Sequence, residues 1–153
     1  MNSKARTILT AGVVAVALGI GVTTQASAGA PRTVSGKASD DITRIADFYG
    51  TYIDAELDKD GDNLPEALRA HYLTPAFQKQ LAAWENREHA DGVLRAQNVP
   101  SAWKVTDNGT VGNHREALVT LTWGGGTTTK LVVDMTRDTH RISRIGEKPA
   151  AGK

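Results

Sequence analysis

The hydrophobic pattern of this chain changes period once, near Gly92, and this change constrains the fold more than any other feature. Before it, apolar residues recur at steps of three and four, as on one face of an α-helix. After it, they alternate with polar residues, as in strands that bury one face. Helices grouped before strands predict an α+β domain, in which three N-terminal helices pack on a curved antiparallel sheet of about four strands.

The first two helices are predicted from their apolar faces and their end signals. The first spans 40–57, with Ser39 as its N-cap and two aspartates in its first turn. The second spans 65–71 and begins at a proline. Asn63 and Glu66, three residues apart, have the spacing of a capping box.

A third helix and four strands complete the predicted domain. Thr74 followed by Pro75 is typical of a helix start, and the helix is expected to end near Glu88. Asn108-Gly109 and Gly112-Asn113 predict turns between the first two strands. The alternating residues that define the strands are Trp103 and Val105, then Ala117 to Trp123, then Leu131 to Met135, and finally Ile142 and Ile145.

The first 28 residues have the pattern of a secretory signal peptide. Lys4 and Arg6 give a positive start, and Ile8–Val22 contains no charge. Ala26–Ala28 then offers the small-x-small pattern of a cleavage site, so we expect cleavage after Ala28 and a secreted, extracytoplasmic protein. The apolar run is short for a permanent membrane span, although an uncleaved anchor is the competing interpretation.

Composition divides the rest of the chain into one domain and two polar ends. No cysteine is present, so the exported chain must fold on its apolar core without disulfides. Stretches poor in apolar side chains cannot repay the entropy of ordering. The predicted organisation is a signal peptide at 1–28, a flexible spacer at 29–38, a single domain at 39–146 and a disordered tail at 147–153.

Charge excludes one class of partner. The chain has 18 basic and 17 acidic residues, and two of the basic ones lie in the predicted leader. No basic run or stripe is present, so a nucleic acid is not an expected partner. Membrane contact is expected only during signal-directed export.

Three segments carry a resemblance to a known family. They are Phe48–Tyr52, Tyr72–Phe77, and Asp91 with Ala96–Trp103, followed by the four strands. In order and spacing they resemble the cone-shaped nuclear transport factor 2-like superfamily, most of all an uncharacterised branch of exported bacterial proteins. The resemblance covers about Ser39–Gly146 and implies a helix-covered, curved sheet. It implies no reaction and no cofactor, since this fold hosts enzymes and plain binding modules alike.

An acidic stretch after the first predicted helix offers a weak calcium site. Asp58, Asp60 and Asp62 alternate as in the opening of an EF-hand loop. Position 12 of that loop is Arg69, where a bidentate glutamate is required, and position 6 is Asn63 rather than glycine. A solvated acidic turn is therefore the favoured interpretation.

A ligand pocket, if present, is expected between the first helix and the concave sheet, where proteins of this fold bind ligands. Asp134 and Asp91 are the weak candidates for a general base there, since burial would raise the pKa of a carboxyl group. The competing interpretation is that the aromatic residues fill the core and Asp134 points outward. The pocket candidates are Tyr49, Tyr52, Tyr72, Trp84, Trp103 and Trp123.

Two classes of function remain. The first is an exported, non-catalytic binding or inhibitor-like module for an unknown small molecule, peptide or extracellular protein. The second is an isomerase- or dehydratase-type enzyme with a pocket carboxylate as general base. The sequence contains no His and carboxylate set at motif-grade spacing, which favours binding. The protein is expected to be a monomer or a homodimer.

Overall fold

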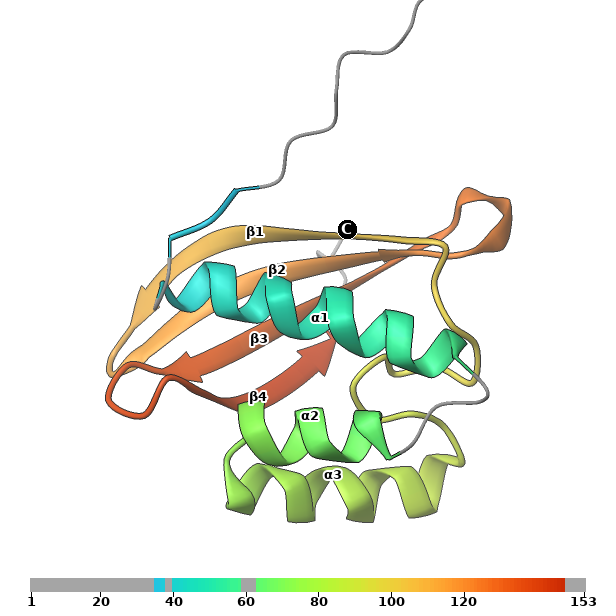
Figure 1. The fold of residues 1–153 in the computed structure, drawn as a ribbon, viewed down its shortest axis with the longest axis horizontal. Coiled ribbons are helices and arrows are strands. Elements are labelled where there is room, and N and C mark those ends of the chain that lie inside the picture. Colours follow the sequence, from blue (N-terminus) through green and yellow to red (C-terminus); the bar gives the residue numbers. More distant parts are fainter. Residues whose placement is uncertain (1–34, 38–39, 59–62, 148–153) are drawn as a thin grey trace, which may run out of the picture. The chain divides into compact units, whose positions relative to one another are not determined.

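The computed structural model describes residues 35–37, 40–58 and 63–147 (Figure 1). It shows an α+β domain with three helices and a four-stranded antiparallel sheet. No described helix is long and apolar enough to cross a membrane. The helices are α1 (Asp41–Leu57), α2 (Leu64–Tyr72) and α3 (Pro75–Glu88), and the strands are β1 (Ala102–Val111), β2 (His114–Thr122), β3 (Thr128–Thr136) and β4 (Arg141–Glu147).

The predicted side-chain cap is confirmed at α3. At α1 another residue caps the helix, and at α2 the side-chain cap is missing. Thr74 caps α3, because its hydroxyl accepts a hydrogen bond from Phe77 N at 3.2 Å. At α1 the cap is Asp40, whose carboxylate accepts from Thr43 N at 2.9 Å, and the predicted cap Ser39 lies outside the described residues. Asn63 makes no capping hydrogen bond with its side chain, so the predicted capping box is wrong.

The strands form a meander in the order β1-β2-β3-β4. Gly112-Asn113 makes the first hairpin turn as predicted, but Asn108-Gly109 lies inside β1. There the register shifts between Asp107 and Gly109, and Gly109 takes a φ of 98°, which glycine adopts without strain. A turn-forming dipeptide thus became a bulge within a long strand. Gly125, with a φ of 80°, lies in the reversal between β2 and β3.

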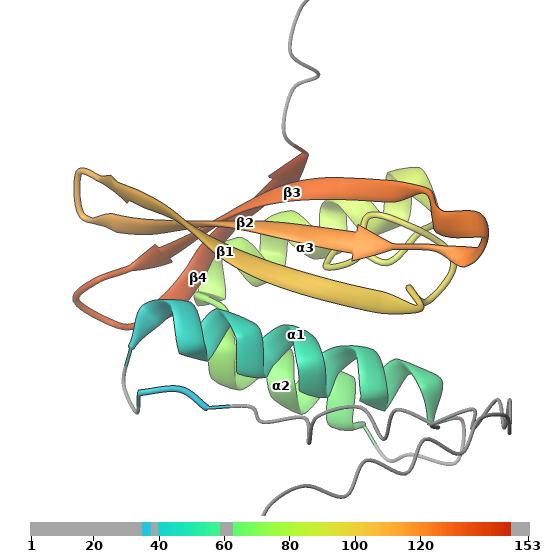
Figure 2. The same cartoon turned by 90° about the horizontal axis from the view of Figure 1, so that it is seen from above.

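One apolar core joins the helices to the inner face of the sheet. Figure 2 shows α1 lying along the sheet, where it contacts β1, β2 and β3. Helices α2 and α3 contact β4, and Leu73 forms an isolated parallel bridge with Ile142 of that strand. The fully buried side chains of this core include Ile45, Phe48, Tyr49, Tyr52, Leu73, Val119, Leu121, Leu131, Val133, Met135 and Ile142.

The layered arrangement is confirmed in its coarse form. Helices precede strands, as the change of period predicts, and the inner face of β2 and β3 is buried. The three helices do not share that face equally, however, because α1 lies over the first three strands while α2 and α3 pack at β4. In the strand order β1 is an edge strand, and α1 contacts it.

Candidate functional site

Asp91 lies in the loop that follows α3, and three residues donate hydrogen bonds to its carboxylate. Tyr52 Oη donates to Oδ2 at 2.6 Å, and Arg69 Nη2 lies 2.7 Å from the same oxygen. Leu94 N donates to Oδ1 at 2.6 Å. Both carboxylate oxygens of Asp91 therefore already accept hydrogen bonds from the protein.

Arg69 extends these contacts to α3. Its Nη1 lies 2.8 Å from Glu85 Oε1, which also accepts from Gly92 N at 2.8 Å. We refer to Tyr52, Arg69, Glu85 and Asp91 as the Arg69 cluster. It ties α1, α2 and α3 to the loop that follows α3, and its charged side chains are about four-fifths covered.

Burial and charge fix the protonation of this cluster. Burial raises the pKa of Tyr52, and the adjacent Asp91 carboxylate raises it further. Burial alone would lower the pKa of Arg69, but Tyr52 and Asp91 outweigh it and the pKa is raised. Burial also raises the pKa of Glu56, and Asp91 adds to the effect. Tyr52 thus remains a donor and Arg69 a cation, which is the state of a structural clamp rather than of a proton relay.

The sequence did not predict that Arg69 joins Tyr52, Glu85 and Asp91. The partners of Arg69 lie 16 to 22 residues away, beyond the reach of any helix-spacing rule. Glu85 and His89, four residues apart, have the spacing of a carboxylate and an imidazole on one helix face, but His89 is the left-handed C-cap of α3. No signal in the sequence identified this cluster.

Asp134 lies on the sheet face opposite the helices. Its neighbours Val133 and Met135 point into the core, while Asp134 pairs across the strands with Glu116 and Arg144. Arg144 Nε donates to Oδ2 at 2.6 Å, and this hydrogen bond raises the pKa of the guanidinium. Oδ1 is buried and has no hydrogen-bond partner among the described residues. The geometry matches an outward strand residue in an ion pair.

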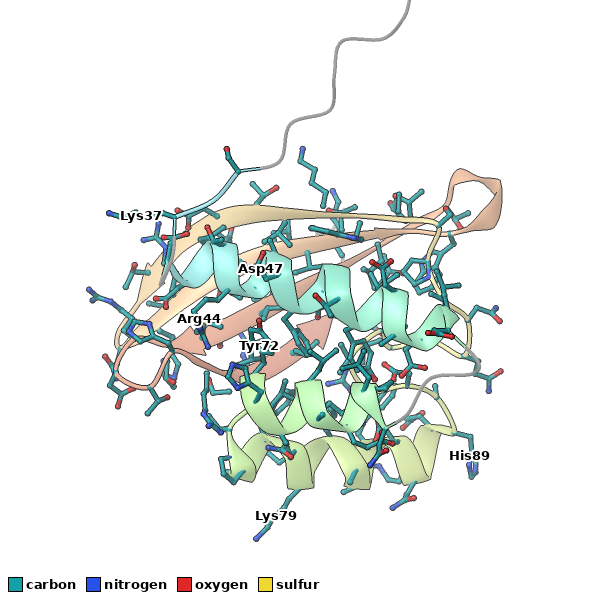
Figure 3. The ribbon with its side chains drawn as sticks, viewed as in Figure 1. Lys37, Arg44, Asp47, Tyr72, Lys79 and His89 are labelled. Atoms are coloured by element: carbon teal, nitrogen blue, oxygen red, sulfur yellow. The ribbon has the colours of Figure 1, made fainter. Side chains whose placement is uncertain are left out.

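The predicted pocket aromatics occupy separate places. Tyr49 and Tyr52 are fully buried in the core, and Tyr49 Oη donates to Val93 O at 3.3 Å. Tyr72 packs at the edge of this core, with the Arg44 guanidinium 5.4 Å from its ring centre (Figure 3). The structure therefore assigns these three tyrosines to packing and not to one cavity.

The three tryptophans lie apart from one another. Trp123 borders the core, and its Nε1 donates to Thr129 at 2.9 Å. Trp84 of α3 lies under the Arg95 guanidinium at 4.2 Å, a cation–π contact beside β4. Trp103 of β1 is 39% exposed and borders a groove.

That groove lies beside α1 and has a largely apolar lining. It has a volume of about 510 Å³ and lies between the first half of α1 and the start of β1. Ile42, Ala46, Trp103 and Val105 supply its apolar surface. We call it the α1–β1 groove; its other lining residues are Ser35, Gly36, Thr43 and Asp47.

One acidic side chain, Asp47, lines the groove. Asp54 follows it seven residues later on the same stripe of α1. Both side chains are exposed, and the described part of the chain places no cation in an ion pair with either carboxylate. Figure 3 shows Asp47 on α1, with Lys37 beyond the start of the helix. The groove therefore presents apolar surface and negative charge together.

The calcium prediction falls mostly outside the described chain. Asp60 and Asp62 lie outside the described residues, while Asp58 forms the C-cap of α1 through its backbone. Across 35–37, 40–58 and 63–147, no group of three or more histidine or acidic side chains is arranged to hold a metal ion. The described residues thus offer no support for a metal centre.

Comparisons with known proteins give information on the fold of this chain and none on its function. No family model matches the sequence, and no curated protein matches it. A crystal structure of a protein of unknown function from Bacteroides thetaiotaomicron VPI-5482 is similar, with a TM-score of 0.54 and 19% sequence identity. The match covers 69% of this chain and 87% of that one. At this identity the similarity concerns the fold alone.

Proposed function

We propose that this protein is an exported, non-catalytic binding module that holds an extended peptide or a strand of an extracellular protein in the α1–β1 groove. The single observation that carries the proposal is Trp103, a large aromatic side chain that is 39% exposed in a groove also lined by the exposed Asp47. Aromatic side chains that are partly open and flank a groove supply much of the energy of peptide recognition.

The edge of the sheet supports the same proposal. β1 is the first strand in the sheet order, and only β2 pairs with it among the described strands. An extended peptide can add to such an edge through main-chain hydrogen bonds while its side chains enter the adjacent groove. The other outer strand, β4, already forms a bridge through Leu73.

The contacts of the two candidate bases support binding over proton transfer. Asp91 is held by Tyr52, Arg69 and Leu94, and Asp134 is held by Arg144. A general base needs a lone pair within reach of substrate. Both oxygens of Asp91 already accept hydrogen bonds, while Asp134 shares Oδ2 with Arg144 and has Oδ1 buried. No specific observation favours the isomerase or dehydratase alternative.

Export and family membership belong to this proposal. The charged start and apolar run of 1–28 support secretion, with cleavage after Ala28. The grouping of helices before a meander supports the nuclear transport factor 2-like resemblance, including a curved sheet covered by helices.

The test is a selection of random peptides displayed on phage against the chain 29–153, which contains every described helix and strand. Enriched peptides are expected to combine basic and apolar residues and to shift the NMR amide signals of Ala46, Gly50 and Trp103. Trp103→Ala should abolish the binding, whereas Val111→Ser, at an exposed site near the other end of β1, should preserve it. Enrichment of peptides that bind elsewhere, or of none, would refute the proposal.

A further inference from the structure

The outer edge of β1 is regular over a short length only. The pairing of β1 with β2 shifts register between Asp107 and Gly109, where Gly109 has a φ of 98°. Such a bulge bends a strand and increases its twist, so it interrupts the edge that a partner strand would follow. The regular part of the edge therefore covers residues 102–107. A segment of about six residues matches that length, because residues pair one to one across a regular ladder.

The two faces of this edge differ in character. Trp103 pairs with the buried Leu121, so its side chain lies on the helix-covered face of the sheet and borders the α1–β1 groove. Lys104 comes next along the strand and therefore points to the opposite face. There it pairs with Thr120 and is exposed. A strand added at this edge would present alternate side chains to the groove and to the outer face of the sheet.

Lys104 has no ion-pair partner within the part of the chain that the structure describes. Thr120 pairs with Lys104 on one side and with Lys130 on the other, so this row of three residues contains no carboxylate. An acidic side chain on an added strand, directly opposite Lys104, would supply the missing pair of opposite charges. A lysine at a sheet edge also hinders strands that offer no such partner, so it both excludes and selects.

We propose that Lys104 is a specificity-determining residue of the α1–β1 groove, and that the partner is an extended segment of about six residues with an acidic side chain opposite this lysine. The side chains before and after that acidic residue lie opposite Trp103 and Val105 and face the groove, which Asp47 also lines. They are expected to be apolar or basic. The inference rests on the proposed function, because it names the ligand class of the same site.

Parallel selections test this pattern. Random peptides displayed on phage are selected against the chain 29–153 and against its Lys104→Glu variant. The parent chain should enrich peptides that carry an acidic residue between two apolar or basic ones. The variant should enrich peptides with lysine or arginine in place of the acidic residue. Enrichment of the same peptides by both proteins, with binding still lost in Trp103→Ala, would overturn the inference and leave the proposed function standing.

A matched control is present on the same face of the sheet. Lys130 is also exposed and lies in the same row as Lys104, two strands away. Neighbouring strands are about 4.8 Å apart, so an acidic residue opposite Lys104 would lie roughly 14 Å from Lys130, beyond the distance at which 0.1 M salt screens a surface charge. Lys130→Glu makes the same change in net charge and should alter the affinity for an enriched peptide by less than about twofold.

Charge exchange with a synthetic copy of the most enriched peptide completes the test. Lys104→Glu should weaken its binding about fivefold, since a pair of opposite charges becomes a pair of like charges. Replacing the acidic residue of the peptide by lysine should restore binding to the Lys104→Glu variant and weaken binding to the parent chain. Equal weakening by Lys104→Glu and Lys130→Glu would show an effect of net charge only, which overturns the inference.

The two proposals fail in different ways. If neither protein enriches a peptide, or if Trp103→Ala leaves peptide binding intact, the proposed function fails and Lys104 has no ligand to select. If peptides depend on Trp103 but bind the parent chain and the Lys104→Glu variant equally, the proposed function stands and only this inference fails.

Discussion

The Arg69 cluster and the α1–β1 groove both border α1, but their charged side chains differ in burial and in ion pairing. In the cluster, Arg69 is shared between two carboxylates, and Tyr52 donates to one of them. In the groove, the exposed Asp47 has no ion-pair partner among the described residues. Partnered charges that are largely covered hold elements together, whereas an open charge beside apolar surface is available to a ligand.

This difference explains why we propose the α1–β1 groove as the functional site, in place of the candidate bases Asp91 and Asp134. The sequence offers Asp91 as a candidate general base, but its hydrogen bonds to Tyr52, Arg69 and Leu94 N make it part of the Arg69 cluster. Trp103 was one aromatic among six, and only its exposure separates it from the buried tyrosines. The proposed function therefore depends on exposed surface more than on residue type.

The largest expected effect is at the centre of the cluster. Arg69→Met keeps much of the side-chain volume but leaves Asp91 and Glu85 partly buried without their cation. We expect a loss of about 3 kcal/mol in the free energy of unfolding, measured by urea denaturation. Arg87→Met on α3 is the control and should change little, because among the described residues its guanidinium donates only to Ala83 O of its own helix. Equal effects of the two variants would remove the contrast between cluster and surface.

The next effect is at the groove. Trp103→Ala should cost about 2 kcal/mol, less than the roughly 3 to 5 kcal/mol of a fully buried tryptophan, because the ring is 39% exposed. Peptide binding should nevertheless be lost. Unfolding and peptide titration on the same samples check both parts. A loss as large as that of Arg69→Met would show that Trp103 belongs to the core, and the comparison would break.

The variant Gly50→Ala should change the shape of the α1–β1 groove with little change in the free energy of unfolding. An added Cβ would lie 2.9 Å from Trp103 Cζ2, so Gly50→Ala must displace the indole ring. The gain in helix propensity, about 1 kcal/mol, should largely offset this strain. We expect nearly unchanged stability with altered tryptophan fluorescence and weaker peptide binding. Unaltered fluorescence and binding would show that the groove is insensitive to the position of the ring.

The smallest expected effect concerns Glu56, a carboxyl group influenced by Asp91 of the Arg69 cluster. Burial and Asp91 raise the pKa of Glu56 above its ordinary 4.5, so the fold favours its neutral form. Its contribution to stability is therefore greatest below pH 4.5 and is lost as pH rises through the raised folded-state value. Glu56→Gln should stabilise the protein near neutral pH by a few tenths of a kcal/mol, because solvent screens the half-exposed group.

Thermal unfolding across this pH range checks the Glu56 prediction. The difference between Glu56→Gln and the parent should vanish at acidic pH, where both side chains are neutral. Glu88→Gln, at an exposed position on α3, is the control and should show no such pH-dependent gain. A destabilising Glu56→Gln near neutral pH would mean that the ionised carboxylate is itself a member of the clamp.

Local patterns were sufficient for most of the fold. Apolar residues at steps of three and four before Gly92 predicted the start of α1 to within one residue. Thr74-Pro75 predicted the start of α3. Local signals failed where a competing structure was available. Asn108-Gly109 was absorbed into a strand as a bulge, and Asn63 made no side-chain cap. Pairing with β2 outweighs the turn preference of a dipeptide.

The sequence by itself determined the order of helices and strands, because periodicity and end signals act between residues close along the chain. Only the tertiary structure decided which charges are partnered and which aromatic is open. Arg69 meets Asp91 across 22 residues, and Trp103 meets Gly50 across more than fifty, through packing that no local spacing encodes. Burial and partnership depend on the whole fold, so the clamp and the groove emerged only once α1 was placed on the sheet.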